Sequence, residues 1–363
     1  MSVLPALTWA ALNCTPVSVP LAQPVRTASG DVTHASLALI DLVTEQGTIG
    51  RSYLFAYAPW ALQPLVALVK GLGELLAGHP IAPAEIERAL QARLRLLGCT
   101  GLAAMALAGI DMAAWDALAR AAGLPLARLL GGRPRAVPGY DSQGMDGAER
   151  GGELAQRAVA QGFTMMKIKI GYPTLEEDLA AVRHVQSVLG RKCALAVDYN
   201  QSLSVPEALR RCGALDPLGL AWIEEPTLAD DDEGHARIAA CMHTPLQLGE
   251  NWFGTHAMAR SLRQQACDLV MPDAMKIGGV SGWLRAASLA GAATRPMSSH
   301  LFPELSAHLM AVTPTAHWLE VLDLAAPVLA APLRVEGGCV HPADAPGSGV
   351  DWNDAAVERY RVR

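Results

Sequence analysis

The sequence predicts an α/β protein, a βα barrel joined to a smaller α+β domain. Five short apolar runs each end on an acidic residue or a histidine, namely Asp198, Glu224, Glu250, Asp273 and His300. The steps between these residues are 26, 26, 23 and 27 positions, about the length of one strand, one helix and two short loops. The chain of 363 residues is longer than a barrel of about 200–250 residues, so a second domain is expected.

The first 132 residues are predicted to form the α+β domain. Strand-forming residues between turn signals predict three strands, over residues 17–19, 35–43 and 48–55. Three helices are predicted next, over residues 60–76, 83–97 and 102–122. A three-stranded sheet followed by helices is typical of an α+β fold. The Gly131-Gly132-Arg133-Pro134 stretch marks the boundary with the barrel.

The barrel is predicted over residues 133–324. Residues 165–170 form one of its strands, and the helix that follows begins with a capping box made by Thr174 and Glu177. Ser204 and Glu207 predict the same cap one unit later. The segment over residues 325–363 is rich in proline and glycine and too short to fold alone, so we expect it to pack back on the α+β domain.

Composition narrows the class of protein. A hydrophobic share of 51% with 18% charged residues fits a large buried core. The net charge of −6, with no run of Lys and Arg, argues against a nucleic-acid partner. Seven scattered cysteines without a CxxC pair argue against disulfides and a zinc site. No basic segment precedes the N-terminal apolar residues, and Asp111 interrupts the longest apolar stretch well short of a membrane span. We therefore expect a cytoplasmic protein without a membrane partner.

Three of the strand-end residues predict a metal site. The C-terminal ends of barrel strands meet at one face, so Asp198, Glu224 and Glu250 can converge on one ion. Carboxylate oxygens suit Mg²⁺, with Mn²⁺ as an alternative ion, and the absence of Cys and His from the set disfavours zinc. Any one of these acids could instead cap the following helix. Three in consecutive strands at nearly equal spacing favour the metal.

Two lysines on one strand are candidate bases. Strand alternation places Lys167 and Lys169 on the same face, with Ile168 on the other. If that face is the barrel interior, each ammonium group lowers the pKa of the other, which makes a lysine a usable base near neutral pH. The alternative is a solvated pair on an edge strand. The apolar neighbours Met165, Met166 and Ile170 favour the interior.

Asp273, His300 and Glu320 are the remaining candidate catalytic residues. An Asp that accepts a hydrogen bond from one imidazole nitrogen fixes the tautomer and makes the other nitrogen more basic. A lone histidine is more often structural, and His308 and His317 can be packed core residues. Glu320 ends the next apolar run, where burial would keep its carboxyl group protonated and able to donate a hydrogen bond to an oxyanion.

These motifs resemble a known enzyme family. Residues 108–116, with the sequence AGIDMAAWD, resemble the N-terminal signature of the mandelate racemase and muconate-lactonising group of the enolase superfamily. Within that group the mandelate racemase branch is the most similar, from about Val19 to the C-terminus. The barrel motifs that carry this similarity are KIK (167–169), DYN (198–200), WIEEP (222–226), GEN (249–251), PDAMK (272–276) and SSHLF (298–302).

The resemblance implies a fold and a mechanism. The fold is a modified (β/α)7β barrel of the TIM type with an α+β capping domain. The mechanism is proton abstraction next to a carboxylate, with an enediolate stabilised by Mg²⁺ held by the three acids. Lys169 and the Asp273–His300 dyad would be bases on opposite faces, Lys167 would neutralise the substrate carboxylate and Glu320 would donate a hydrogen bond to it. The resemblance also implies substrate contacts by Ser142 and Asn200, support from Glu225, Asn251 and Lys276, and a homo-oligomer, an octamer.

The expected substrate is a small hydroxy acid, and the expected activity is racemisation. An apolar wall for mandelate or a close aryl analogue is predicted from Val25, Ala28, Val32, Phe55, Tyr57, Leu301 and Leu322. Residues 24–32, the specificity loop by resemblance, depart from the family in carrying Arg26 and Ser29. Arg26 is expected to point to solvent or to pair with a second acid group of a substrate.

Three functions other than racemisation are compatible with a barrel of this kind. The main alternative is an acid-sugar (aldonate or aldarate) dehydratase with the same metal site and bases, which a pocket lined with polar groups would favour. A muconate-type cycloisomerase is disfavoured, because that branch keeps a lysine where Asp273 stands. A non-catalytic barrel is disfavoured because no predicted base is missing.

Overall fold

The computed structural model describes residues 6–27 and 30–362 and confirms the predicted fold class. The N-terminal capping domain is an antiparallel sheet of β1 (Trp9–Thr27), β2 (Gly30–Thr44) and β3 (Ile49–Phe55), in the order β1-β2-β3. Helices α1 (Pro59–Glu74) and α3 (Gly101–Ala121) pack against it, and α2 (Pro83–Leu94) packs against α3. The short helix α4 (Leu126–Leu129) leads to the barrel.

Helix α3 is the central element of the capping domain. Its small residues let it approach β3 so closely that a Cβ on Gly50 would lie 2.0 Å from the carbonyl oxygen of Ala113. The helix is long and apolar enough to cross a membrane by length and composition, yet 83% of its most apolar 18-residue window is buried inside the protein. Its apolar character therefore serves the core of this domain.

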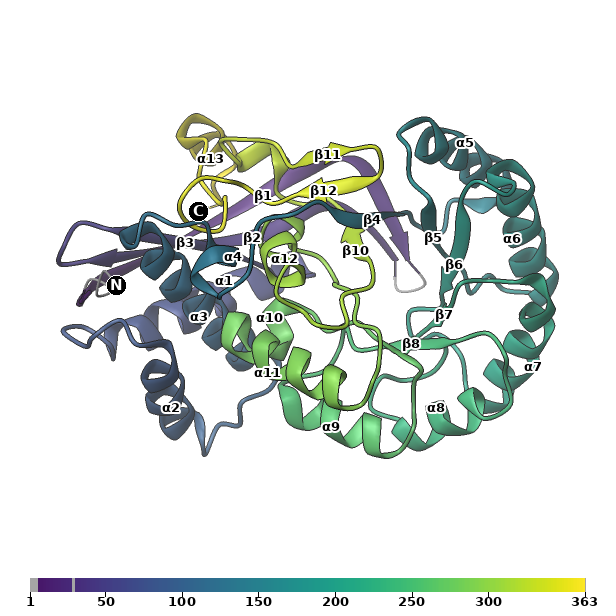
Figure 1. The fold of residues 1–363 in the computed structure, drawn as a ribbon, viewed down its shortest axis with the longest axis horizontal. Coiled ribbons are helices and arrows are strands. Elements are labelled where there is room, and N and C mark those ends of the chain that lie inside the picture. The colour runs from purple at the N-terminus through teal and green to yellow at the C-terminus, as the bar shows by residue number, and fades with distance from the viewer. Residues whose placement is uncertain (1–5, 28–29, 363) are drawn as a thin grey trace.

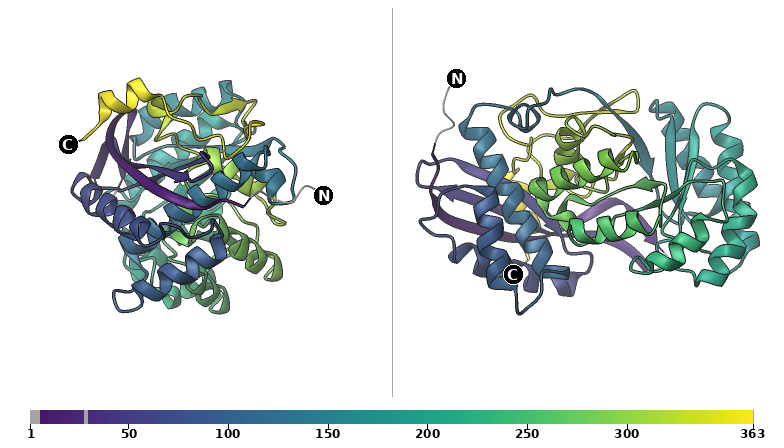
Figure 2. Two further views of the ribbon diagram at one scale, coloured as in Figure 1. Left: turned by 90° about the vertical axis from the view of Figure 1, so that its left-hand side faces the viewer. Right: turned by 60° about the horizontal axis from the view of Figure 1, so that its bottom comes forward.

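The hairpin of β1 and β2 is longer than the sequence predicted. Residues Val25 and Val32 still pair across it, beyond a register shift between Pro20 and Val25. Prolines at 16, 20 and 24 interrupt the apolar pattern of β1, so only residues 17–19 carried a strand signal, but an edge strand tolerates proline. Figures 1 and 2 show the hairpin extending from the capping domain across to the barrel.

The barrel is a ring of short parallel strands. Its sheet runs through β4 (Val137–Ser142), β5 (Met165–Lys169), β6 (Ala194–Asp198), β7 (Ile223–Glu224), β8 (Leu246–Leu248) and β9 (Leu269–Val270). Strand β10 (Leu319–Val321) pairs with the other edge of β4. Single bridges from Met297 to Val270 and to Ala316 link the two ends. The ring therefore closes.

Helices surround the barrel, as Figure 1 shows. They are α5 (Gly147–Ala160), α6 (Leu175–Leu189), α7 (Val205–Leu215), α8 (Asp232–Ala239), α9 (Thr255–Arg263), α10 (Ala274–Ile277), α11 (Gly279–Ala292) and α12 (Pro303–Met310). The capping box of Thr174 and Glu177 at the start of α6 is confirmed. The predicted cap of Ser204 and Glu207 is wrong, because the Glu207 carboxylate instead accepts hydrogen bonds from Arg210 and Arg211.

The C-terminal segment contacts both parts of the molecule. Strand β12 (Cys339–His341) pairs with β4 of the barrel and with β11 (Arg334–Glu336). Helix α13 (Asp354–Tyr360) lies against β1 of the capping domain. The segment thus covers more than the capping domain that the sequence had suggested. All seven cysteines are free thiols.

Candidate active site and metal centre

Three carboxylates meet at the C-terminal face of the barrel. Asp198 ends β6, Glu224 ends β7 and Glu250 follows β8 by two residues. Each offers an oxygen, and these oxygens all lie within 4.8 Å of one another. Oε2 of Glu250 is buried without a hydrogen-bond partner among the described residues. Three converging oxygen ligands and an unsatisfied carboxylate oxygen fit Mg²⁺, whose other positions remain for water and substrate.

Lys167 and Lys169 project into this cluster from β5. Nζ of Lys167 lies 2.6 Å from Glu224 Oε1 and 3.1 Å from Glu320 Oε1, and the side chain is fully buried. Nζ of Lys169 lies 2.5 Å from Asp198 Oδ2. The two lysines therefore share the interior face of the strand, and Lys167 bridges Glu224 and Glu320.

The sequence predicted lowered pKa values for Lys167 and Lys169, and this prediction is wrong for the arrangement of the site. Burial lowers the pKa of Lys167, but the carboxylates of Glu224 and Glu320 outweigh it and hold the pKa well above its usual value. Burial and the Lys167 charge lower the pKa of Lys169, yet Asp198, Glu250 and Glu224 together raise it above its ordinary value. A cation held by the same carboxylates would supply the positive charge that opposes this attraction.

Asp273 and His300 form the predicted pair. The two residues are paired in a single parallel β-bridge. Nδ1 of His300 lies 2.7 Å from Asp273 Oδ2. This contact leaves Nε2 facing the acids, 3.2 Å from Glu250 Oε2. Burial lowers the pKa of His300, but Glu250, Glu320 and Asp273 together raise it to about 9. The imidazole is thus oriented and favoured in its protonated form.

Glu320 lies between Lys167 and His300, on β10. Burial raises its pKa, but the charges of Lys167 and His300 and the N–H of Leu301 lower it below its ordinary value. The expectation of a protonated carboxyl group is therefore wrong, because neighbouring cations outweigh burial. Oε1 accepts a hydrogen bond from Ser142 Oγ at 2.8 Å, and Oε2 accepts one from the backbone N of Leu301 at 2.9 Å.

Polar residues hold the metal ligands in place. Asn200 donates to Asp198 from both its backbone N, at 2.7 Å, and its Nδ2, at 3.0 Å. The left-handed backbone of Asn200, with φ of 45°, makes the double contact possible. The side chains of Asn251 and Lys276 lie beside Glu250 and Glu225. Burial, with Glu250 and Asp198 nearby, raises the pKa of Glu225 well above its usual value.

Two ligand-holding residues were missed by the sequence analysis. Nε1 of Trp222 donates to Glu224 Oε2 at 3.0 Å, and Nε2 of Gln247 lies 3.2 Å from the same oxygen. Trp222 stands two residues before Glu224, so strand alternation could have placed it on the same face. Gln247 could not have been found this way, because its contact depends on the pairing of β8 with β7.

The predicted apolar wall does not form one continuous surface. Ala28 and Ser29 lie outside the described residues. Phe55 and Leu301 are buried in the core. Val32 and Tyr57 line a hollow beside the hairpin, whereas Val25 and Leu322 line a different cavity at the rim of the barrel. The described residues of the wall are therefore divided between the core, the hollow beside the hairpin and the cavity at the rim.

Arg26 is 44% exposed, as expected of a residue that points to solvent, and it also pairs with an acid of the barrel. Its guanidinium group pairs with Asp146, in the loop between β4 and α5, while its backbone oxygen accepts a hydrogen bond from Met145 N at 2.9 Å. A Cβ on Gly144 would lie 2.7 Å from Arg26 N, so only glycine permits this approach. The hairpin is thus fastened to the barrel.

The rim cavity beside Val25 has a mixed lining with several polar groups. It lies at the ends of β4 and β10 beneath the hairpin and includes Ser142, whose hydroxyl contacts Glu320. Gln23 of the hairpin donates to Gln143 at 3.1 Å, and Gln143 donates to Asp141. The full polar lining is Gln23, Asp141, Ser142, Gln143, Arg157 and Asp323.

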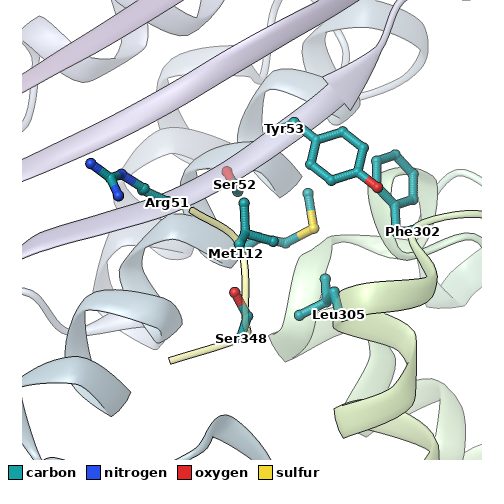
Figure 3. A pocket seen from close by; sticks show the side chains of 8 residues that line it. Arg51, Ser52, Tyr53, Met112, Phe302, Leu305 and Ser348 are labelled. Carbon is teal, nitrogen blue, oxygen red and sulfur yellow. The ribbon is translucent and has the colours of Figure 1, made fainter. Parts of the chain in front are cut away.

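A separate small cavity lies between the capping domain and α12. Figure 3 shows Tyr53 and Phe302 on one side of it and Met112, Leu305 and Ser348 on the other. The hydroxyl of Tyr53 donates to Glu304 Oε2 at 2.8 Å. This cavity lies at the interdomain contact and includes none of the predicted catalytic residues.

Comparison with known proteins agrees with this architecture. Residues 10–131 match the mandelate racemase/muconate lactonizing enzyme N-terminal domain, and residues 151–356 match the enolase C-terminal domain-like family. The 3,6-anhydro-alpha-L-galactonate cycloisomerase of Streptomyces coelicolor is 33% identical over 93% of this chain and 96% of its own length. The L-talarate/galactarate dehydratase of Salmonella typhimurium is 30% identical, over 93% and 87% respectively.

A solved structure is more similar still. An enolase from Bradyrhizobium, in complex with magnesium and mandelic acid, superposes with a TM-score of 0.96 at 43% identity, over 99% of this chain and 100% of the other. The fold and the acid cluster define a Mg²⁺-dependent enzyme of the enolase superfamily. Within it, the chain belongs to the mandelate racemase/muconate lactonizing enzyme family.

Proposed function

We propose that this enzyme is an acid-sugar dehydratase that acts on an aldonate or aldarate. The observation that carries the proposal is the pair of proton-transfer groups at the acid cluster, Lys169 and an imidazole, His300, that is favoured in its protonated form and can act as a general acid. A polyhydroxylated chain leaves each buried hydroxyl unpaired in an apolar pocket, at a cost of about 1–3 kcal/mol per group. The described residues do not form the continuous apolar wall that would exclude such hydroxyls. The dehydratase and cycloisomerase relatives support the same substrate class.

In the proposed reaction, two residues exchange protons with the substrate. Lys169, whose pKa falls when a cation offsets the charge of Asp198, removes the proton from C2, next to the carboxylate, and the electrons of the broken C–H bond form the enediolate. His300, held by Asp273 at 2.7 Å, protonates the hydroxyl on C3, which leaves as water while a C2–C3 double bond forms. The resulting enol becomes a 2-keto-3-deoxy acid. When bound, Mg²⁺ supplies charge stabilisation to the substrate carboxylate.

Lys167, Glu320 and Ser142 position the carboxylate end in this proposal. The ammonium group of Lys167 stands between Glu224 and Glu320, where negative charge increases during proton removal. Because Glu320 is ionised here, we assign it to holding Lys167 and His300 in place, with Ser142 fixing its orientation. The three residues together set the field around the reacting carbon.

Racemisation of a 2-hydroxy acid is the second candidate. It is favoured by proton-transfer groups on two sides of the acid cluster, Lys169 on β5 and His300 beyond β9. The mandelic acid bound to the Bradyrhizobium enolase supports it as well. The two candidates share the first step and differ in whether a hydroxyl leaves from C3.

One pair of assays separates the candidates. A library of aldonates and aldarates is incubated with the enzyme and Mg²⁺, and keto-acid product is measured, while mandelate is followed by polarimetry. We expect keto acid from at least one acid sugar, with a higher kcat/KM than that for mandelate, and none with Lys169→Ala. Racemised mandelate without keto acid from any acid sugar would show that the proposal is wrong and that the second candidate is right.

A further inference from the structure

The capping domain contacts a buried cation next to the metal site. Tyr57 follows β3 and has a left-handed backbone, with φ of 57°. Nζ of Lys276, on α10 of the barrel, lies over its ring, 4.5 Å from the centroid. Lys276 is 5% exposed and Tyr57 is 40% exposed, so the ring lies between the ammonium group and the solvent side. A cation over the face of a tyrosine ring is attracted by the ring electrons, more strongly when water is excluded.

The same ammonium group fixes the orientation of an amide. Nζ of Lys276 donates to Oδ1 of Asn251 at 2.6 Å. Because the amide oxygen is held there, Nδ2 of Asn251 faces the acids and donates to Glu225 Oε2 at 2.7 Å and to Glu250 Oε1 at 3.2 Å. The reverse orientation would place the amide oxygen against two carboxyl groups and leave Lys276 facing a donor.

This chain of contacts ends on a metal ligand. Glu250 receives the Asn251 bond on Oε1, which leaves Oε2 without a hydrogen bond among the described residues, with Nε2 of His300 at 3.2 Å as its neighbour. Unlike Asp198 and Glu224, Glu250 lies beyond the end of its strand, in the segment after β8. Its orientation therefore depends more on side-chain contacts than on the sheet.

We propose that Tyr57, Lys276 and Asn251 couple the position of the capping domain to the affinity of the metal site. In this proposal Tyr57 is a positioning residue that acts on Glu250 through Lys276 and Asn251. The ring holds the ammonium group over the amide, the amide orients the carboxylate, and Mg²⁺ binds more tightly as a result. By linkage, bound Mg²⁺ also favours the docked position of the Tyr57 segment. The inference does not depend on which hydroxy acid is the substrate.

The test measures Mg²⁺ binding to the intact enzyme in the absence of substrate, by isothermal titration calorimetry. Tyr57→Phe keeps the ring face and should bind Mg²⁺ within about 2-fold of wild type, while Tyr57→Leu should bind about 3- to 10-fold more weakly, the range of a partly desolvated cation–π contact. Trp60→Leu is the matched control, since Trp60 lies three residues further on and is 80% exposed. It should leave the affinity unchanged.

A double-mutant cycle separates coupling from a general structural effect. Lys276→Met removes both the contact to Asn251 and a positive charge that opposes Mg²⁺, so it serves as the reference state, and adding Tyr57→Leu to it should cause no further loss of affinity. Circular dichroism and thermal unfolding of each variant report whether it folds. Wild-type affinity in Tyr57→Leu, or an equal loss from that change with and without Lys276, would overturn the proposal. If Tyr57→Leu does not fold, wild-type affinity in the charge-neutral variant Asn251→Leu overturns it instead.

Discussion

Each charged residue in the site has its ionisation state set by its neighbours. When every group is ionised, six carboxylates stand against four cations, which leaves a formal charge of −2 in a buried space, equal and opposite to that of one Mg²⁺. The carboxylates are Asp198, Glu224, Glu225, Glu250, Asp273 and Glu320, and the cations are Lys167, Lys169, Lys276 and His300. Buried charges that are not balanced are costly, so this excess of negative charge is itself an argument for the ion.

At the residue scale, the two proton-transfer groups should be separable by substrate configuration. Lys169→Ala removes one group and should leave exchange of the C2 proton with D₂O for the configuration that faces His300. His300→Asn should have the opposite effect. Proton NMR of a pair of C2 epimers in D₂O with Mg²⁺ measures both rates. Loss of exchange for both epimers in both variants would contradict the assignment of the groups to two faces.

At the element scale, buried hydrogen bonds hold the capping domain against the barrel. Asp111 of α3 is buried and accepts hydrogen bonds from the backbone N of Ser281, at 2.9 Å, and from its Oγ, at 2.6 Å. The indole N–H of Trp115, one turn further along α3, donates a hydrogen bond to Ser281 Oγ. Helix α3 thus supports both the sheet of the capping domain and α11 of the barrel.

Asp111 should make this junction sensitive to pH. Burial raises the pKa of Asp111 from an ordinary 3.8 to about 7, although the bonds from Ser281 oppose the rise. A raised carboxyl pKa favours the folded state at low pH, and that contribution is lost as pH increases from about 4 to about 7, by at most about 1.4 kcal/mol per pH unit. Asp111→Asn should remove this loss. Thermal midpoints of both proteins between pH 4.5 and 7.5 would test it, and parallel curves would show that Asp111 does not titrate in this range.

Buried acids also organise elements within the barrel. Asp178 of α6 accepts hydrogen bonds from the backbone N of Gly171 and Tyr172, both at 2.9 Å, and pairs with Arg211 of α7 at 2.7 Å. Gly171, the first of the two residues that Asp178 holds, lies two positions after Lys169. Asp178→Ala should therefore lower the thermal midpoint, because it leaves the largely buried Arg211 with one fewer partner. An unchanged midpoint would show that the loop needs no such support.

At the scale of the whole molecule, the metal should contribute to both activity and stability. EDTA should abolish activity and Mg²⁺ should restore it, because the excess negative charge would otherwise repel an anionic substrate. An ion that binds only the folded state stabilises it by about 2.7 kcal/mol at a free concentration of 100 times its Kd. Differential scanning calorimetry with and without Mg²⁺ measures this effect. Full activity after exhaustive chelation, with elemental analysis of the protein, would remove the ion from the mechanism.

The sequence by itself determined the fold class, the family and the Mg²⁺ site. Regular spacing of Asp198, Glu224 and Glu250 was enough, because the barrel repeats one strand, one helix and two loops, and its strand ends converge. Strand alternation likewise placed Lys167 and Lys169 on one face. These features depend on local periodicity, which a chain of residues displays directly. The prediction of racemisation in preference to dehydration rested on an apolar wall, which no local sequence pattern could establish.

Only the tertiary structure decided the features that depend on distant partners. Arg26 meets Asp146, 120 positions away, and this contact closed a loop whose strand signal was interrupted by prolines. The apolar residues expected in one wall were divided between the core, the hairpin and the rim. The ionised state of Glu320 and the raised pKa values of the lysines follow from charges contributed by several strands. Electrostatic energy depends on distance in space rather than on separation along the chain, so these properties are fixed only when the strands are assembled.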